Sequence, residues 1–494
     1  PPAQTAACNP ATDVGGIVFR DYNANGVQDT NEPGLDRKVA PVTVTAYGAA
    51  NQLLGSATIQ ADGSYTISGP NLGRSARIEF SGLPTWLQPS AHSGSSSTLV
   101  QFVGGPNCNV KLAVNNPRDF CGANPQLATT CFTSGDPLGG DSAGNSDALV
   151  TWSYAESGWW YPYPSIAVAG TAAMPTKLAL SAQMGSTWGI AYQRSTKTIF
   201  TSAVLKRHAG FGPFGPGGIY AVDISDPNVP VVRQFLDLTA LVGGDPRTTP
   251  LPVKADAQSR DPEALPWIGK MSFGGMDISE DERTLYVMNL NNNGALIVLD
   301  IASQSVTAQV PISAPNPGCQ QTTGAISVPA PKEDIRPWAV KVKDGEVYVG
   351  VVCSAQTSQN PADLHAYVMQ LEGNTFTTVF DFKLDYKKGI VSDGKPKSKT
   401  DTGWFPWTDD FNMLISLDPG EKEQTLIHPQ PILSAIEFDA DGSMILGFSD
   451  RTGHMGGRKN LNPNPNDATL YNAHTGGDIL RVCKKNGAYV LQGS

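Results

Sequence analysis

The feature that most constrains the fold is a pattern that recurs four times between residues 188 and 481. Each unit has an apolar strand, a short polar turn, a second strand, a longer loop and a third strand. Repeated units of a few short strands are typical of β-propeller blades, because each blade buries its faces against its neighbours. The units span residues 188–223, 275–300, 338–369 and 435–481. We therefore predict a propeller over residues 148–494, with residues 148–182 and 384–430 completing a ring of five to seven blades.

A second pattern, at residues 21–32, indicates a calcium site. Oxygen-bearing groups recur along these twelve residues at the spacing of a calcium loop, with glycine at the sharp turn and glutamate at the end. Such a loop supplies about six to eight oxygens to a hard cation. The predicted ligands are the side chains of Asp21, Asn23, Asn25, Asp29 and Glu32 and the backbone carbonyl of Val27. The alternative is an ordinary polar turn rich in Asn, Asp and Gly.

The surroundings of this loop predict strands and not the helices of an EF-hand. Residues 16–19 are apolar and β-prone, and Pro33-Gly34 opposes a helix after the loop. Short strands separated by turns are expected at residues 42–47, 53–60 and 62–67. We therefore predict an all-β chain in which residues 1–115 form a β-sandwich, with calcium linking two of its strands.

These residues carry a resemblance to a known family. The run from Gly16 to Gly34, followed by Val42-Thr43-Val44 and Asp62-Gly63-Ser64-Tyr65, resembles the B-type domain of serine-aspartate-repeat (SdrD-like) surface proteins. The resemblance covers roughly residues 14–114 and implies a calcium-stiffened, Ig-like or prealbumin-like sandwich on a bacterial surface protein. It implies a spacer or stalk role for this domain and no catalysis.

Part of the second region also resembles known sequences. Residues 188–194 and 206–210 are similar to propeller-like regions coupled to B-type domains in large predicted bacterial surface proteins. This resemblance implies an architecture and a location, and no activity comes with it. Residues 116–147, rich in Gly, Pro, Ser and Asn, are too long for a simple hinge, so we expect a connector packed on the propeller of residues 148–494.

Composition and charge exclude several classes of protein. The chain has 494 residues with 51 glycines and 38 prolines, which favours more than one domain and many turns over long helices. Its net charge of −10 argues against a nucleic-acid partner and fits an acidic, calcium-rich exterior. The sequence contains no apolar run near the roughly 18 residues that a membrane-spanning helix needs.

The cysteines predict an oxidising compartment. The seven are widely spaced, with no CxxC motif and no Cys/His metal spacing: Cys8, Cys108, Cys121, Cys131, Cys319, Cys353 and Cys483. A Cys8–Cys108 disulfide would tie the ends of the first domain, and Cys319 and Cys353 fit neighbouring strands of one later unit. The other three leave one odd thiol, and their connectivity stays open. Buried free cysteines are the alternative.

The long loops of the propeller units predict a candidate ligand site. Loops between the second and third strands of different blades open on one face, so residues far apart in sequence converge there. The candidate residues are Lys206, Arg207, His208, Asn291, Asn292, Arg336, Asp450, Arg451 and His454. Together they could hold an anionic or sugar-like ligand. The alternative is that they are solvated loop residues that hydrogen-bond one another.

Other motifs carry less weight. Gly140–Gly144 spells GxSxG, but the strand and helix of a nucleophile elbow are missing around it. Gly210–Gly215 spells GxGxxG, yet Pro213 and Pro216 oppose the helix of a dinucleotide site. Aromatic residues between Trp152 and Tyr163 could stack on sugars or fill the propeller interior. Residues 452–476 are expected to form a lid over the loops or an arm for a neighbouring copy.

These patterns favour a structural or adhesive protein of the cell surface or extracellular space. We expect a building unit of a layer, filament or matrix, stabilised by calcium and partnered by copies of itself, by other surface proteins or by carbohydrate. No nucleic acid or membrane span is expected. The alternatives are a secreted, lactonase-like propeller hydrolase and a carbohydrate-binding surface protein. A metal ion with an open coordination position at the propeller centre would favour the hydrolase.

Overall fold

The computed structural model confirms that the chain is all-β. It describes residues 8–492 except 23, 30–31, 70–71, 73–74, 91–97, 120–121, 158–174, 292–293, 314, 324–325, 330–331, 392–399, 417–422, 440–441 and 486. The chain divides into two compact units, of which the first contains Pro1–Ala123 and the second almost all of the rest. The α-helices are one turn each: α1 (Ser181–Met184), α2 (Thr239–Val242) and α3 (Thr452–Met455).

Short 3-10 helices occur in the connections. They are η1 (Pro117–Asp119), η2 (Tyr154–Glu156), η3 (Gly215–Gly217), η4 (Leu265–Trp267), η6 (Lys332–Asp334), η7 (Pro361–Asp363) and η8 (Phe411–Leu414). No helix in the described part of the chain is long and apolar enough to cross a membrane.

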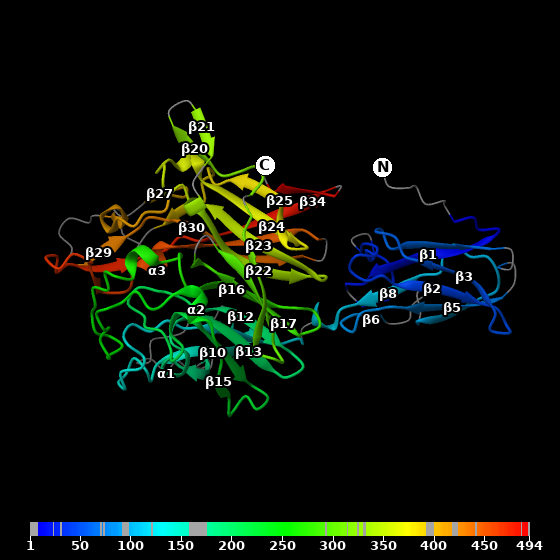
Figure 1. Ribbon diagram of the computed structural model, residues 1–494, viewed down its shortest axis with the longest axis horizontal. Coiled ribbons are helices and arrows are strands. Elements are labelled where there is room, and N and C mark those ends of the chain that lie inside the picture. The colour runs from blue at the N-terminus through cyan, green and yellow to red at the C-terminus, as the bar shows by residue number, and fades with distance from the viewer. Residues whose placement is uncertain are drawn as a thin grey trace. The chain divides into compact units, whose positions relative to one another are not determined.

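The first unit is a sandwich of two four-stranded sheets (Figure 1). One sheet, ordered β4-β1-β8-β6, contains β1 (Asp13–Arg20), β4 (Ser64–Ser68), β6 (Gln88–Pro89) and β8 (Leu112–Asn115). The other, ordered β3-β2-β5-β7, contains β2 (Thr43–Tyr47), β3 (Leu53–Thr58), β5 (Ala76–Ser81) and β7 (Val100–Val103). β1 pairs antiparallel with β4 and parallel with β8.

Alternation along the strands builds the core of the sandwich. β2 and β5 bury every second side chain, including Val44 and Ile78, and leave the residues between them partly accessible. The rings of Tyr65 and Phe80 meet edge to face with centroids 5.8 Å apart, and the Tyr65 hydroxyl donates to the Val110 carbonyl at 2.8 Å. Each large apolar side chain that is fully buried in this way contributes about 1.5–3 kcal/mol.

The described residues contain two disulfides, at the pairings that the spacing favoured. Cys8 is bonded to Cys108 in the first unit, and Cys319 to Cys353 in the second. The first closes a loop with a sequence separation of 100 residues. In the chain-entropy model a loop of that size contributes about 4–5 kcal/mol by restricting the unfolded chain. Cys131 and Cys483 are free thiols, and Cys121 lies outside the described residues.

The second unit contains four antiparallel four-stranded sheets with the strand order of propeller blades (Figure 1). Their first strands, β12, β16, β22 and β30, pack side by side in that order. The first two sheets are β12 (Thr187–Gln193), β13 (Thr198–Ala203), β14 (Gly218–Asp223) and β15 (Val231–Asp237), then β16 (Phe273–Ile278), β17 (Thr284–Asn289), β18 (Ala295–Asp300) and β19 (Ser305–Pro311). The next two are β22 (Ile335–Lys343), β23 (Glu346–Cys353), β24 (His365–Glu372) and β25 (Thr375–Lys383), then β30 (Pro431–Phe438), β31 (Met444–Asp450), β34 (Asp478–Lys485) and β35 (Ala488–Leu491).

The four units of the sequence pattern coincide with the first three strands of these sheets. The sequence pattern did not locate the fourth strand of each sheet, because an outer strand lies at a sheet edge and buries little. β19, for example, leaves five of its seven residues largely in contact with solvent and buries only Val310 fully. An edge strand of this kind carries little apolar periodicity for a pattern to detect.

The segment expected as a connector contributes a strand to the second unit. β9 (Gln126–Thr130) pairs with β10 (Asp147–Ser153), which pairs with β11 (Thr176–Leu180) in a three-stranded sheet. Two further pairs of strands form two-stranded sheets. β20 (Gln320–Thr323) pairs with β21 (Ile326–Pro329), and β26 (Gly389–Val391) pairs with β27 (Thr400–Thr402).

Residues 452–476 are neither a free arm nor a detached lid. They supply β32 (Asn460–Leu461) and β33 (Leu470–Ala473) to a sheet completed by β28 (Ile415–Ser416) and β29 (Glu423–Leu426). Met455 and Tyr471 are buried in the core of the second unit. The sparse apolar residues of this segment are therefore anchors, which its high Asn, Gly and Pro content had concealed.

Candidate functional site

The first strands of the blades share an irregularity that directs side chains to one place. Antiparallel pairing shifts register near the start of β12, β16, β22 and β30. Trp188 and Trp338 lie in two of these bulges, which are known to re-aim side chains. A Cβ on Gly275 would lie 2.9 Å from the Trp338 carbonyl oxygen, so only glycine allows the neighbouring strands to approach this closely.

His454 lies among aromatic rings, two of which belong to these bulges. Its ring centroid is 5.0 Å from Trp188, 5.6 Å from Trp338 and 6.1 Å from Phe132. The Lys206 ammonium lies 5.0 Å from the centre of the Phe132 ring and donates to the Gly453 carbonyl. Burial lowers the pKa of Lys206 to about 8 and, together with Lys206 and Arg451, holds the pKa of His454 well below its usual value.

Arg207 uses its guanidinium to hold separate loops together. Its Nε donates to the carbonyls of Arg260 and Asp261 at 3.2 Å, its Nη1 to Met455 at 3.1 Å and its Nη2 to Leu461 at 2.8 Å. The side chain also lies over the Phe411 ring at 4.9 Å, and the residue is only 1% exposed. Most of its N–H donors are therefore used on carbonyl oxygens of the protein itself.

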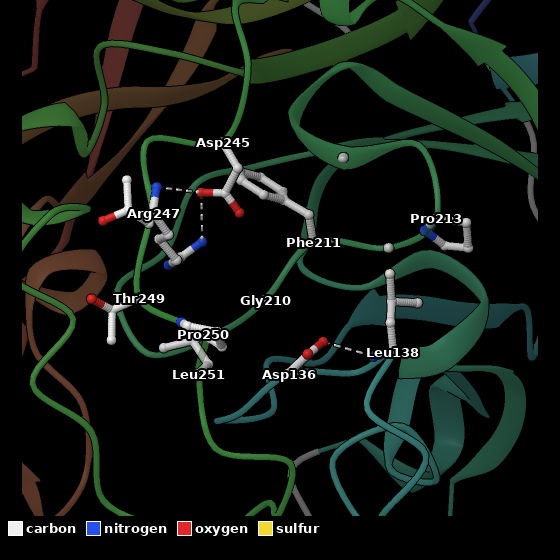
Figure 2. A pocket seen from close by; sticks show the side chains of 13 residues that line it. Asp136, Leu138, Gly210, Phe211, Pro213, Asp245, Arg247, Thr249, Pro250 and Leu251 are labelled. Atoms are coloured by element: carbon white, nitrogen blue, oxygen red, sulfur yellow. Dashed lines mark hydrogen bonds and ion pairs between the residues drawn. The ribbon is translucent and has the colours of Figure 1, made fainter.

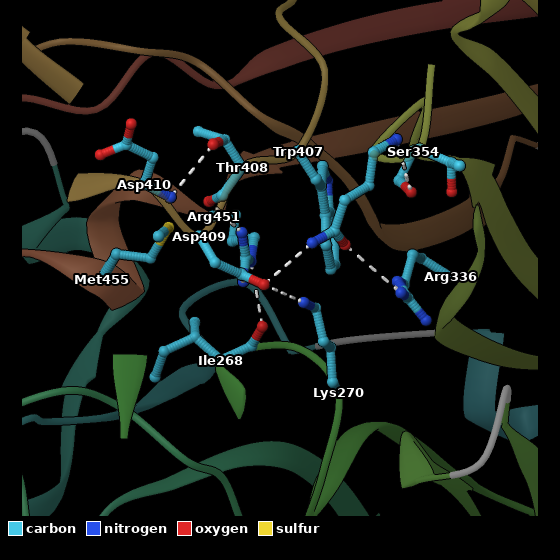
Figure 3. Close-up of polar contacts among 12 residues, drawn as sticks. Ile268, Lys270, Arg336, Ser354, Trp407, Thr408, Asp409, Asp410, Arg451 and Met455 are labelled. Carbon is cyan, nitrogen blue, oxygen red and sulfur yellow. Dashed lines mark hydrogen bonds and ion pairs between the residues drawn. The ribbon is translucent and has the colours of Figure 1, made fainter. Parts of the chain in front are cut away.

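Arg451 does the same on another set of loops (Figure 3). It donates to the carbonyls of Ile268 at 3.0 Å and Thr408 at 2.8 Å, and to the Asp409 carboxylate at 2.6 Å. The guanidinium stacks over the Trp407 ring at 4.6 Å and is completely buried. Burying a cation is favourable only when its donors are satisfied, and here they are satisfied by the protein itself.

Asp409 also accepts from two partly buried side chains. Lys270 donates to its carboxylate at 2.7 Å (Figure 3), and Gln356 donates to it at 2.9 Å. Burial alone would raise the pKa of Asp409, but Arg451 and Lys270 bring it below its usual value. Arg336 lies beside this group, over Trp407 at 5.5 Å, and reaches Gln356 only at 3.4 Å.

Sequence reasoning missed a third buried arginine. Arg247 forms a bidentate ion pair with Asp261, both nitrogen–oxygen distances being 2.9 Å, and also donates to the Lys206 carbonyl at 2.8 Å. The Asp261 carboxylate also accepts from the His208 backbone N–H at 2.7 Å, and His208 has a φ of 71°. Burial, followed by the nearby cations, holds the pKa of His208 well below its usual value. No motif surrounds Arg247 or Asp261, so only the fold reveals the pair.

The remaining candidates take other roles. Asp450 accepts from the backbone N–H groups of Gln430 and Thr452 at 2.9 Å, and burial raises its pKa to about 6. Asn291 belongs to a local turn, because its own N–H donates to the Asn289 side chain at 2.9 Å. Asn292 lies outside the described residues.

The charged cluster of Arg207, His208, Arg451 and His454 is therefore buried, and the alternative that these are solvated loop residues is wrong for all four. Each is at most 5% exposed. Buried atoms without a hydrogen-bond partner include His454 Nδ1 and Trp338 Nε1. The arrangement is chemically suited to joining backbone segments.

A cavity of about 330 Å³ lies beside this cluster (Figure 2). Asp136, Phe211, Asp245, Arg247 and Leu251 are among the residues that line it. The GxGxxG segment forms part of its wall, and η3 there is a single 3-10 turn, so the structure has no dinucleotide-binding helix at this motif.

The GxSxG segment and the described part of the aromatic run lie at or near the surface. Ser142 of the GxSxG segment is an exposed turn residue whose hydroxyl accepts from the Ala255 N–H at 3.1 Å. In the aromatic run, Trp152 donates to Ser157 at 3.2 Å and Tyr154 is exposed, while residues 158–163 lie outside the described residues.

The predicted calcium loop folds around two buried carboxylates. Asp21 accepts from the N–H groups of Asn25 at 3.1 Å and Gly26 at 2.7 Å, and Glu32 accepts from those of Tyr22 at 2.8 Å and Asp29 at 2.9 Å. Both carboxylates are almost inaccessible, and neither has an ion-pair partner among the described residues.

The other predicted ligands of this loop are less deeply placed. The Asn25 side chain donates to Asp29 at 3.1 Å and accepts from the Val27 N–H at 2.7 Å. Asn23 is outside the described residues. Within the described part, no three His, Cys, Asp or Glu residues are grouped as a metal shell.

Replacing Arg451 by Met should destabilise the second unit by about 3–5 kcal/mol, because Asp409 and several carbonyls would stay buried without their donor. Denaturant unfolding of the whole chain measures this. Arg233→Met is the control, because the Arg233 side chain is 67% exposed and its contact with the Asp223 carboxylate is long, at 3.5 Å. A loss as small as that of the control, within about 0.5 kcal/mol, would contradict the assignment.

The buried histidines predict acid sensitivity. His208 and His454 have pKa values well below 6.5, so the unfolded chain binds their protons more tightly and stability falls as the pH drops below about 6.5. Burial raises the pKa of Asp450 to about 6, so the folded chain binds this proton more tightly than the unfolded chain. Asp450 therefore adds stability as the pH falls from about 6 toward its unfolded pKa.

Burial also lowers the pKa of His428 to about 4 and raises the pKa values of Asp245 and Asp277. We expect the three histidines to dominate because their unfolded pKa lies between pH 5.5 and 7.5, so the second unit should melt at a lower temperature at pH 5.5 than at pH 7.5.

The matched variant is His454→Phe, which removes one titrating group and keeps an aromatic ring. Differential scanning calorimetry across this pH range should show a shallower slope for the variant. An unchanged slope would show that His454 does not titrate between the folded and unfolded states.

Comparisons with known proteins agree with the sequence resemblance. Residues 12–100 match the family model described as the SdrD B-like domain. Colossin-C of Dictyostelium discoideum is 25% identical over 452 residues, covering 89% of this chain and 40% of that protein. Serine-aspartate repeat-containing protein D of Staphylococcus aureus (strain Newman) is 34% identical over 116 residues, covering 21% of this chain and 8% of that protein.

The chain thus spans less than half the length of these relatives. Among solved structures, a putative TolB from Agrobacterium tumefaciens is 12% identical, with a TM-score of 0.27, over 70% of this chain and 90% of that one. The Colossin match extends through both units, whereas the family model and the staphylococcal protein match the first. Residues 12–100, which contain most strands of the sandwich, are therefore an SdrD B-like domain.

Proposed function

We propose that this chain is a structural or adhesive building unit of an extracellular surface, with a calcium-stabilised sandwich and a propeller-like second unit. The observation that carries the proposal is the internal use of the charged cluster. Arg207 and Arg451 donate to carbonyls of loops that are far apart in sequence. A hydrolase would need such groups to face a substrate, so the bonding supports a framework role over the lactonase-like alternative.

An extracellular location follows from the covalent chemistry and the first unit. Disulfides persist in oxidising compartments, and the chain has one in each unit. The SdrD B-like domain implies a surface protein and a spacer or stalk role. We infer partners among copies of this chain and other surface molecules.

Calcium is proposed from the donors of the loop and its electrostatics. Hard divalent cations prefer carboxylate, amide and carbonyl oxygen, which are the groups that residues 21–32 present. Asp21 and Glu32 are 1% and 6% exposed, and a buried carboxylate without a cationic partner is costly. A bound cation would remove that cost and cross-link the two ends of the loop.

Calcium removal should lower the melting temperature of the first unit by several degrees. Extracellular calcium modules bind at about 10⁻⁴–10⁻³ M, so about 10 mM calcium would stabilise the folded state by roughly 1.4–2.7 kcal/mol. Glu32→Gln should reproduce the effect of chelation, because it removes the carboxylate that closes the loop. Calorimetry with and without a chelator measures both.

Asp62→Asn is the matched control for this experiment. It also removes one carboxylate from the first unit, but Asp62 lies in another turn, where it accepts from Ser64. Its calcium response should equal that of the unchanged chain. The calcium proposal fails if chelation leaves the melting curve of the unchanged chain unaltered.

The structural role predicts ordered association of the purified chain. Sedimentation velocity and negative-stain images at about 10 mM calcium, the concentration that saturates such sites, should show assemblies larger than the monomer. The same preparation should not hydrolyse glucono-δ-lactone above the rate in buffer. A strictly monomeric chain that turns over the lactone would overturn the structural proposal in favour of the hydrolase.

A further inference from the structure

The outer face of the β3-β2-β5-β7 sheet carries an unusual row of side chains. Tyr47 lies opposite both Leu53 and Arg77, and Arg77 lies opposite Phe102. Directly paired residues of antiparallel strands share one face, so these four side chains form a line across the sheet. Phe102 is 80% exposed at the end of this line.

Packing does not account for Phe102. The inward-facing positions of the sandwich hold its core, and an outward position on a half-solvated sheet normally carries a polar residue. Val100, two residues earlier on the same edge strand, is also exposed and lies opposite Glu79. β7 therefore presents an apolar strip to solvent along the edge of the sheet.

A polar strip runs beside it on β5. Arg77 donates through Nε to Glu79 at 2.7 Å and through Nη1 to the Asn51 side chain at 2.8 Å. The guanidinium also lies over the Tyr47 ring at 5.0 Å, which fixes its plane. Because Arg77 and Glu79 balance each other, the strip offers several hydrogen-bond donors and acceptors without net charge.

A cavity adjoins the two strips where β2 and β7 end and β5 begins. It measures about 490 Å³, within the range of small-molecule sites. Arg77 and Phe102 line it, together with small residues such as Gly48 and Gly104. Arg77 and Phe102 thus belong to both the strips and the cavity wall.

We propose that this face of the first unit binds a neutral saccharide chain. A sugar ring has an apolar C–H face that can stack on Phe102 and a hydroxyl edge that can bond to Arg77, Glu79 and Asn51. The absence of net charge in the polar strip favours a neutral glycan over an anionic one. A second copy of the chain fits less well, because a stable protein interface buries about 800 Å² per partner and the apolar strip here is narrow.

Isothermal titration of the whole chain with cellohexaose, xylohexaose, mannohexaose and maltohexaose tests the proposal. At least one of these neutral hexasaccharides should bind, and Phe102→Ala should weaken binding at least tenfold. Phe102→Trp should retain it, because an indole offers a larger stacking face. Ile479→Ala is the control for losing an exposed apolar side chain, since Ile479 is 75% exposed and belongs to the second unit.

Three results would overturn the inference. The first is no heat of binding with any of the four sugars, and the second is binding that Phe102→Ala leaves intact. The third is self-association that Phe102→Ala abolishes without any sugar binding, which would make this face a contact between copies. None of these results bears on the calcium loop, so the proposed function and this inference can fail separately.

Discussion

Hydrogen bonds from buried guanidinium groups to backbone carbonyls hold the second unit together. Arg207, Arg247 and Arg451 each join loops that are remote in sequence, and none is more than marginally exposed. A carbonyl that ends a strand or turn inside a protein needs a donor, and the planar fork of arginine can serve several at once. The blades could pack through their apolar faces alone, but the loops between them could not be buried without these donors.

The first unit is held together by different interactions. Its core is a plain alternation of apolar side chains between two sheets, closed by the Cys8–Cys108 disulfide. The Asp21–Glu32 loop leaves two buried carboxylates for a cation to neutralise, whereas the second unit buries the cationic side chains of Arg207 and Arg451. Each unit therefore buries charged groups. In the second unit the arginines bond to oxygen atoms of the protein itself, and in the first unit we propose that calcium neutralises the carboxylates.

The sequence predicted what depends on local pattern. Alternating apolar residues located the inner strands of four blades, and the spacing of Asp21 to Glu32 located the loop of the SdrD B-like domain. Outer strands such as β19 were missed, because edge positions need few apolar residues. The burial of Arg207 and Arg451 was also missed, since their partners at residues 260–268, 408 and 455–461 come from other loops. The sequence predicted that these long loops converge, but no spacing shows that carbonyls of neighbouring loops surround the guanidinium groups.

The central claim, that the buried arginines bind the protein and not a ligand, can be tested by proton exchange. In the chain labelled with ¹⁵N-arginine, nuclear magnetic resonance can follow each Nε–H group, with single Arg→Lys variants assigning the signals. The account predicts that the Nε–H groups of Arg207, Arg247 and Arg451 exchange with water far more slowly than that of Arg233, because each donates to an internal oxygen. Exchange as fast as that of exposed Arg233 would contradict it.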